Sequence, residues 1–215
     1  MKDLSCLLAG LLNLLCPLFL LILWHKRTGA RLYPALIAFV VCFPVFFIGN
    51  VIRLGFDRSD AIAFYIQQGL LYGVFEECTK YIMMRYALSD YDNRRDAVTY
   101  AVGHASYESL GMGFTCLGLI GTGSAIPEIF FFQLWSVTES MLSAAAVGIL
   151  IFYAVQRNRA IVIMPAVILL HAVCNASVGI FVEPVAIAVN TLAAAGECLA
   201  AYRCWNLLTP FYEDE

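Results

Sequence analysis

The chain has 215 residues, of which 61% are hydrophobic and 13% are charged, and its net charge is −3. Soluble domains are typically about 45–50% apolar and about 25% charged, so this composition indicates a polytopic membrane protein with little chain left for a soluble domain. The small net charge and the lack of a basic patch argue against nucleic acid as a partner. The eight cysteines form no Cys-x-x-Cys pair, so neither a disulfide framework nor a zinc knuckle is indicated.

Seven apolar segments are long enough to cross a membrane as helices. Their connections are short, and short connections place consecutive helices side by side in an antiparallel bundle. We interpret the first segment as a retained helix rather than a signal peptide, because it is about 20 residues long and is followed by basic residues instead of a small-residue cleavage site. We therefore expect an all-α transmembrane bundle in which residues 1–215 form a single integral membrane domain. The segments cover residues 4–24, 33–52, 60–88, 97–121, 127–153, 159–182 and 184–205.

The positions of Lys and Arg beside these segments predict the orientation of the chain. Nine of them fall on one side of the membrane and three on the other, while Lys80 lies inside a segment. Because short cytoplasmic loops carry an excess of Lys and Arg, we expect the N-terminus outside and the C-terminus in the cytoplasm. The nine are Lys26, Arg27, Arg31, Arg85, Arg94, Arg95, Arg157, Arg159 and Arg203, and the three are Lys2, Arg53 and Arg58.

The third apolar segment contains two adjacent glutamates, Glu76 and Glu77, and a lysine, Lys80. On a helix Glu76 and Lys80 lie one turn apart on one face, with Glu77 at its flank. An ionisable side chain at the centre of a bilayer costs about 2.5–3.5 kcal/mol, so such residues usually face the protein interior and indicate a functional site. Gly69 and Gly73 continue the same stripe, which allows a neighbouring helix to approach closely.

The fourth and sixth segments each carry two polar residues spaced four apart. His104 and Glu108 share one helix face, and His171 and Asn175 share another. At a rise of about 1.5 Å per residue, both histidines, Glu108 and Glu76 lie about 10–18 Å below the same membrane surface. Three helices thus bring polar faces to one level, which predicts a buried polar site between the third, fourth and sixth segments.

Two further acids, Glu139 in the fifth segment and Glu197 in the seventh, lie at a comparable depth. For both, a neutral carboxylic acid that bridges helices through hydrogen bonds explains the residue at least as well as catalysis does. Glu139 is also placed to support the site or to line a channel, and Glu197 shares a helix face with Asn190.

The set of two carboxylates, two imidazoles and an amide at one level suits hydrolysis. A glutamate and a histidine can activate water between them, and a second histidine with an asparagine can donate hydrogen bonds to a developing oxyanion. Alternatively, Glu76, His104 and His171 make a three-ligand set for zinc that leaves one coordination position for water. The spacing leaves both mechanisms open. Lys80 is expected to be a charge partner of Glu76 or Glu77.

Three motifs in order carry a resemblance to a known group of enzymes. Glu-Glu-x-x-Lys at 76–80, Gly-His-x-x-x-Glu at 103–108 and His-x-x-x-Asn at 171–175 resemble the intramembrane peptidases of the CAAX-protease and bacteriocin-processing superfamily. The most similar branch is the YhfC type of membrane peptidases, with PrsW-type proteases as relatives. Lys80 favours these branches, because it follows Glu77 by three residues where the prenyl-protein enzymes place an arginine one position later.

The resemblance implies a role for each motif residue. Glu76 with His104 would activate water, and His171 with Asn175 would form the oxyanion hole. The YhfC and PrsW branches are often described as metalloproteases, so zinc is a possible cofactor, while a glutamate-type mechanism would need none. The implied catalytic residues are Glu76, Glu77, His104, His171 and Asn175, the supporting residues are Lys80, Glu108 and Glu139, and the possible metal ligands are Glu76, His104 and His171.

By the same resemblance the protein is expected to be an intramembrane peptidase that hydrolyses a peptide bond at a buried Glu/His site reached from the cytoplasmic side. Its expected partners are membrane lipid and a membrane-embedded or membrane-associated peptide substrate. Its expected location is the plasma membrane of a prokaryote.

Two other classes of function use the same residue types. Buried acids and histidines serve as proton relays in ion-coupled transporters and channels, although the sequence shows no inverted repeat and no pair of interrupted helices in matching halves. A non-catalytic membrane scaffold subunit is the other alternative, because the scaffold of the gamma-secretase complex, a relative in this superfamily, keeps intramembrane histidines without being the protease.

Overall fold

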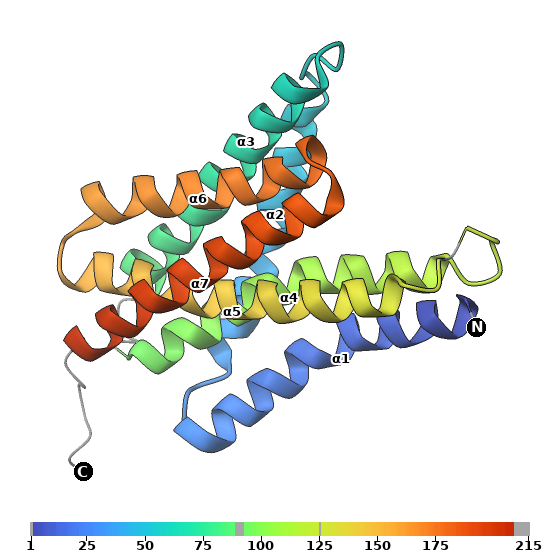
Figure 1. Cartoon of the computed structure of the whole chain (residues 1–215). Coiled ribbons are helices and arrows are strands. Elements are labelled where there is room, and N and C mark those ends of the chain that lie inside the picture. The colour runs from blue at the N-terminus through green and yellow to red at the C-terminus, as the bar shows by residue number, and fades with distance from the viewer. Residues whose placement is uncertain (1, 89–92, 125, 209–215) are drawn as a thin grey trace.

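The computed structural model describes residues 2–88, 93–124 and 126–208. Over these residues the chain is helical and without strands, which confirms the predicted all-α class (Figure 1). A short π-helical turn, Met83–Ala87, continues the third helix. The α-helices are α1 (Lys2–Thr28), α2 (Tyr33–Arg53), α3 (Ala61–Ile82), α4 (Arg94–Gly118), α5 (Ile129–Gln156), α6 (Ala160–Ile180) and α7 (Glu183–Leu207).

The helices begin where the sequence supplies capping residues. The side chain of Asp60 accepts hydrogen bonds from two backbone N–H groups in the first turn of α3, and that of Asn93 accepts one from the N–H of Arg95 in α4. Pro34 and Pro184 occupy the first turns of α2 and α7, where a backbone N–H would have no helical partner. These starts fall in or beside the predicted connections between apolar segments.

Five of the helices, α1, α2, α5, α6 and α7, are long and apolar enough to cross a membrane. The protein is therefore an integral membrane protein. Helices α3 and α4 carry Glu76, Glu77, Lys80, His104 and Glu108, which lower their mean hydropathy. That they also cross the membrane, giving seven spans, stays a prediction.

Helix α3 packs along α6, while α4 packs against α1, α2 and α5, and α7 packs on α5 (Figure 1). Two glycines allow the close contact of α3 with α6. A Cβ atom at Gly69 would lie 2.4 Å from the carbonyl oxygen of Ala172, and one at Gly73 would lie 2.8 Å from that of Ile168. This confirms the close approach predicted from the glycine stripe and fixes α3, with Glu76, beside α6.

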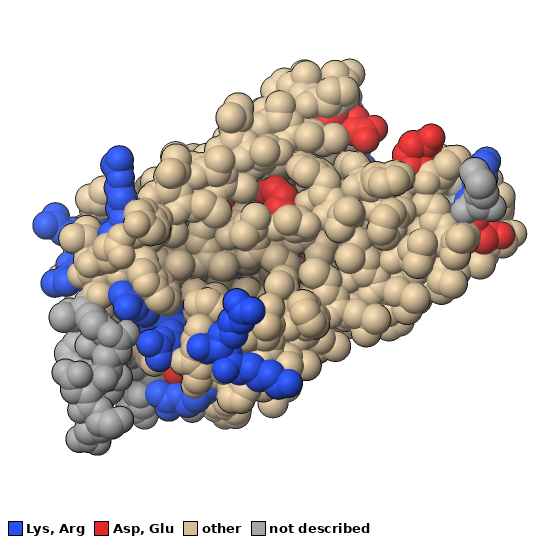
Figure 2. Space-filling view, turned by 60° about the horizontal axis from the view of Figure 1, so that its bottom comes forward, with Lys and Arg blue, Asp and Glu red and all other residues tan. Residues whose placement is uncertain are grey.

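Charge is distributed unevenly along the bundle. Most of the visible Lys and Arg side chains gather at one end, and several Asp and Glu side chains lie toward the other end (Figure 2). We call the first the Lys/Arg-rich end, where α1 and α3 end and α2 and α4 begin. The other is the Lys/Arg-poor end, where α2 ends at Arg53 and α5 begins at Ile129. Which end faces the cytoplasm stays a prediction.

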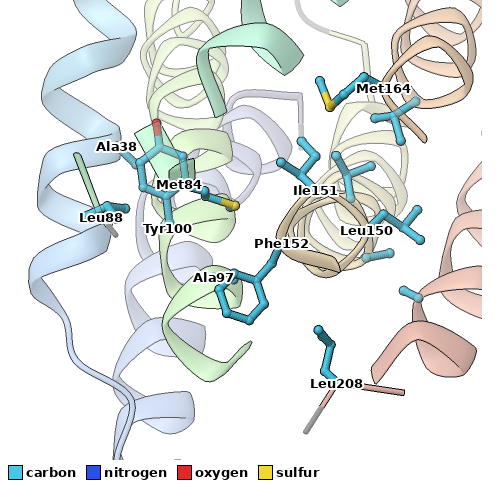
Figure 3. Packing of buried hydrophobic residues seen from close by; sticks show 14 residues of the cluster. Ala38, Met84, Leu88, Ala97, Tyr100, Leu150, Ile151, Phe152, Met164 and Leu208 are labelled. Atoms are coloured by element: carbon cyan, nitrogen blue, oxygen red, sulfur yellow. The ribbon is translucent and has the colours of Figure 1, made fainter. Parts of the chain in front are cut away.

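The Lys/Arg-rich end of the bundle is filled by a cluster of buried hydrophobic side chains, which we call the apolar layer (Figure 3). It draws on helices from α2 to α7 and lies on the Lys/Arg-rich side of Glu76. Its members are Ala38, Met84, Leu88, Ala97, Tyr100, Ala146, Val147, Leu150, Ile151, Phe152, Met164, Val167, Ala201 and Leu208.

Candidate active site

The structure brings Glu76 together with His104 and His171. The Nε2 atom of His104 in α4 lies 3.4 Å from Oε2 of Glu76, and the Nε2 atom of His171 in α6 lies 3.7 Å from the same oxygen. Glu76 and His104 are almost completely buried, whereas the side chain of His171 is 19% exposed. Three helices therefore meet at one carboxylate, and His171 is the one of the two histidines that solvent can reach.

Glu77 points to a different set of partners. Its Oε1 accepts a hydrogen bond from Nζ of Lys80 at 2.7 Å and lies 2.5 Å from Nδ1 of His171. A carboxylate can only accept hydrogen bonds, so Nδ1 of His171 carries the proton and donates it. In the neutral tautomer Nε2 of His171 then has a free lone pair directed toward Glu76. The charge partner of Lys80 is thus Glu77, one of the two that the sequence allowed.

Glu108 completes a second group around Glu76. One ligand atom each from Glu76, His104 and Glu108 lie within 4.8 Å of one another, and the same holds for Glu76, Glu77 and His171. Glu76 belongs to both groups, but the two histidines fall in different ones. The expected zinc set of Glu76, His104 and His171 therefore does not form one compact group, whereas Glu76, His104 and Glu108 do.

The compact group fits a metal ion by its spacing and its chemistry. Two ligands about 2.0–2.2 Å from a tetrahedral ion lie about 3.4 Å apart, and His104 Nε2 lies 3.4 Å from Glu76 Oε2. Imidazole nitrogen and carboxylate oxygen are both zinc ligands. A ligand histidine usually donates its other ring N–H to a second group, and among the described residues no protein group accepts from the buried Nδ1 of His104, so this feature of a metal site is not supplied by the protein.

A cavity of about 300 Å³ adjoins this cluster. Asn175 lines it one helical turn beyond His171, and Glu108 faces it with an exposed side chain. All the predicted catalytic and supporting residues line this one cavity, which brings together side chains from α3, α4, α5 and α6. The oxyanion role expected for Asn175 stays a prediction.

The two additional acids also line the cavity, on helices α5 and α7. The hydroxyl of Ser143 donates a hydrogen bond to Oε2 of Glu197 at 2.5 Å. The amide of Asn190 donates to the hydroxyl of Ser177 at 2.9 Å. Glu197 is buried and bridges α5 to α7, as expected for a structural acid, while Glu139 lies in the cavity wall.

Sequence reasoning missed a polar network between α1, α4 and α5. The buried side chain of Asn13 donates to Oε1 of Gln133 at 3.0 Å, and the hydroxyl of Ser109 donates to the backbone oxygen of Asn13 at 2.8 Å. Asn13 and Ser109 line the cavity. The available signal was an amide inside each of two otherwise apolar segments, since a buried amide requires a hydrogen-bond partner from another helix.

Comparison with known proteins gives a consistent picture. A family model described as YhfC intramembrane metalloprotease matches residues 12–126, more than half of the chain, and so includes the first two motifs but ends before His171. A protein of Bacillus subtilis (strain 168) named "Uncharacterized membrane protein YhfC" is 26% identical over 219 aligned positions, which cover 78% of this chain and 80% of the relative. No solved structure matches the chain.

Proposed function

The chain belongs to the family of YhfC intramembrane metalloproteases, and from this membership and the buried cluster we propose that it is a peptidase that cleaves peptides within the membrane. The observation that carries the proposal is the meeting of Glu76, His104, Glu108 and His171 beside a cavity. Ionisable side chains are rare inside membranes and usually mark a functional site.

A metal ion would be held by Glu76, His104 and Glu108. When bound there, zinc would lower the pKa of a coordinated water and polarise the carbonyl of the peptide bond. The donor set of one imidazole and two carboxylates leaves room for a water or a substrate oxygen, as catalytic zinc sites do.

His171 is placed to carry the proton. Its Nε2 atom lies 3.7 Å from Glu76 and has a lone pair when the ring is neutral, its side chain is 19% exposed, and its Nδ1 lies against Glu77. In this arrangement His171 takes a proton from the attacking water and later delivers it to the leaving amine, while the carboxylate of Glu77 holds the ring in the correct tautomer. Lys80 in turn fixes Glu77. This role differs from the expected oxyanion role, because Nε2 can donate a hydrogen bond only after it has taken a proton.

Asn175 is the candidate for the oxyanion donor. It lies one turn beyond His171 on the same side of α6 and lines the cavity. A side-chain amide that donates to a developing oxyanion contributes about 10²–10³ in rate when it is preorganised in a site that excludes bulk water. The substrate class that fits a site at this depth is a membrane-embedded or membrane-associated peptide.

The test compares peptide termini in membranes of cells that produce the wild-type chain or the Glu76→Gln variant. We expect new N-termini within membrane proteins in the wild-type sample alone. Glu128→Gln is the matched control, because Glu128 is an exposed acid at the start of α5, outside the cavity. Its sample should contain the same new termini as the wild type.

Metal analysis of the purified protein completes the test. We expect about one ion per chain in the wild type and in Glu128→Gln, and a strong loss in Glu76→Gln. If Glu76→Gln retained both its metal and every new terminus, the assigned site would be wrong. Uptake driven by a pH gradient in proteoliposomes, without any new terminus, would favour a transporter, and co-purification with a fixed partner without cleavage would favour a scaffold.

A further inference from the structure

Among the described residues, most of the cavity lining lies between the Glu76 cluster and the Lys/Arg-poor end, and Lys80 lines it one turn from Glu76 on the other side. Its lining on α5 runs from Val147 to Phe132, about 22 Å along the helix axis, and Phe132 lies one turn from the Lys/Arg-poor end. On α4 the lining runs outward from His104 to Met112, and on α6 from His171 to Val178. In all three helices the cavity begins at the level of the cluster and proceeds toward the Lys/Arg-poor end.

On the opposite side of the cluster, the side chains of the apolar layer fill the space between the same helices. Tyr100 in α4, Ile151 in α5 and Val167 in α6 lie along their helices between the cluster and the Lys/Arg-rich end. Tyr100 and Ile151 are completely buried, and Figure 3 shows both among the side chains of the layer. A cavity beside Met84 and Phe152 within this region measures about 10 Å³. That is at the lower limit of the space that one water molecule requires.

The mouth of the cavity lies at the protein surface on the Lys/Arg-poor side. Met112 is 41% exposed and Val178 is 67% exposed, and both line the cavity, so it reaches the surface between α4 and α6. Trp135 and Phe132 near the start of α5 also line the cavity. In the space-filling view, acidic side chains are visible in a hollow between the two ends of the molecule (Figure 2).

Deeper in the cavity the lining becomes polar. Ser136 and Ser140 of α5, Asn175 of α6 and Asn190 of α7 line the passage between the apolar mouth and the cluster. A peptide must unwind before its scissile carbonyl can be attacked, and each unwound backbone N–H or C=O in a membrane requires a new hydrogen-bond partner. Hydroxyl and amide side chains can act as such partners.

We propose, on the basis of the peptidase function, that the substrate is a membrane-embedded peptide segment that enters between α4 and α6 from the Lys/Arg-poor end and reaches Glu76 as an unwound chain. The polar passage hydrogen-bonds its backbone, and the apolar mouth contacts the part that remains in lipid. With the predicted orientation this end is outside the cytoplasm. The proposal therefore replaces the expectation of access from the cytoplasmic side, where the described residues form the apolar layer.

The access route is tested by thiol labelling from each side of the membrane. The eight native cysteines are first replaced, because Cys174 itself lines the cavity. Ser140→Cys then places a thiol in the passage, and Leu150→Cys places one in the apolar layer of the same helix. Leu142→Cys places one on the exposed outer surface of α5 at the depth of Ser140, as a control for reaction from lipid. The probe is a membrane-impermeant, positively charged methanethiosulfonate, applied to sealed vesicles of either orientation.

We expect Ser140→Cys to react at least tenfold faster from the Lys/Arg-poor side than from the other side, while Leu150→Cys and Leu142→Cys react slowly from both. Faster reaction of Ser140→Cys from the Lys/Arg-rich side, or none from either side, would overturn the route. Labelling does not depend on catalysis, so the failure of the peptidase function would leave this pattern unchanged.

Cleavage provides the second measurement. Ser136→Trp fills the passage near its mouth, and Thr138→Trp adds the same side chain to the exposed surface of α5. We expect Ser136→Trp to reduce the yield of new termini at least tenfold with unchanged bound metal, and Thr138→Trp to change neither. If Ser136→Trp cleaved as well as the wild type, or if the cut sites lay in the substrate half at the Lys/Arg-rich side, the route would be wrong although the peptidase function stood.

Discussion

Two adjacent glutamates in one helix acquire different environments because successive helical residues point about 100° apart. Glu76 faces the histidines of α4 and α6, whereas Glu77 is held by Lys80 and by one ring nitrogen of His171. Glu77 and Lys80 are both buried. Their interaction therefore serves two purposes, since it offsets the burial of each charge and fixes the ring of His171.

Removing one member of this buried pair should destabilise the protein strongly. Lys80→Met leaves Glu77 without its cation, and the loss of one partner of a buried ion pair costs about 3–5 kcal/mol. We expect a clear fall in the unfolding midpoint in detergent, followed by the fluorescence of the three tryptophans. The double variant Glu77→Gln with Lys80→Met removes both charges and should recover part of the loss. Equal stability of Lys80→Met and the wild type would contradict the assigned pair.

The roles of Glu77 and Glu108 can be distinguished by the effects of their substitution on bound metal and on the cleavage rate. Glu77→Gln keeps an acceptor for Nδ1 of His171 but removes the charge that stabilises its protonated ring. Because it also leaves the buried charge of Lys80 unpaired, cleavage is measured below the unfolding midpoint of the variant. We expect cleavage to fall by about 10²–10⁴, the usual contribution of general acid–base catalysis, with metal content near that of the wild type. Glu108→Gln weakens the proposed ligand set and should lower bound metal, measured by elemental analysis. Loss of metal in Glu77→Gln with full retention in Glu108→Gln would reverse the two roles.

At the residue scale the sequence predicted the meeting of Glu76, His104 and His171, because their depths can be counted from the segment ends. It did not predict which of the two glutamates each polar partner contacts. Whether Lys80 contacts Glu76 or Glu77 depends on side-chain rotamers within one helical turn. The spacing of three and four residues allows both contacts, and in the structure Lys80 contacts Glu77.

The contact of α3 with α6 is the element-scale feature on which the site depends. Glu76 and Glu77 belong to α3 and His171 to α6, so any separation of the two helices moves the histidine away from both carboxylates. The contact is close because Gly69 and Gly73 have no side chain. A helix backbone is rigid over one or two turns, so a displacement of α3 at either glycine would also move Glu76 and Glu77.

Enlarging Gly69 should therefore impair both stability and activity. A Cβ atom there would lie 2.4 Å from the carbonyl oxygen of Ala172, which is backbone and cannot rotate away. We expect Gly69→Ala to lower the unfolding midpoint and the yield of cleaved peptide together. Gly111→Ala is the matched control, because a Cβ at Gly111 in α4 has no atom within 4 Å. That substitution should be neutral or stabilising by up to about 1 kcal/mol. Similar losses in both variants would contradict a specific role of the α3–α6 contact.

At the element scale all seven apolar segments became helices, and most ends differ by a few residues. The predicted segment 60–88 ends as a π-helical turn after Ile82, and the segment expected at 97 begins at Arg94. Hydropathy shows where a helix can lie in a membrane but not where a cap such as Asn93 starts it. Hydropathy also missed that α1 continues to Thr28 through His25, Lys26 and Arg27, because polar residues at a helix end do not interrupt its backbone hydrogen bonds.

For the whole molecule, the distribution of charge was predictable and the direction of the cavity was not. Lys and Arg are counted directly from the sequence, and they gather at one end of the structure (Figure 2). The cavity depends on how α5 and α7 pack beside the cluster, and on α5 the polar wall of its passage is formed by serines such as Ser136 and Ser140. Serine is tolerated on any face of a membrane helix, so it carries no signal for a passage.

The orientation of the bundle determines what the access route means for the cell, and it can be tested with reporter fusions. Because nine Lys and Arg lie beside the segments at one end against three at the other, we expect that end in the cytoplasm. A green fluorescent protein fused after Glu215 should therefore fluoresce, and a periplasmic phosphatase fused there should be inactive. The same phosphatase inserted at Gly123, in the exposed connection between α4 and α5, should be active. The reverse result would place the mouth between α4 and α6 on the cytoplasmic side. The cavity would then open to the cytoplasm, because the Lys/Arg-poor end would be the cytoplasmic end. Ser140→Cys would in that case react faster from the cytoplasmic side.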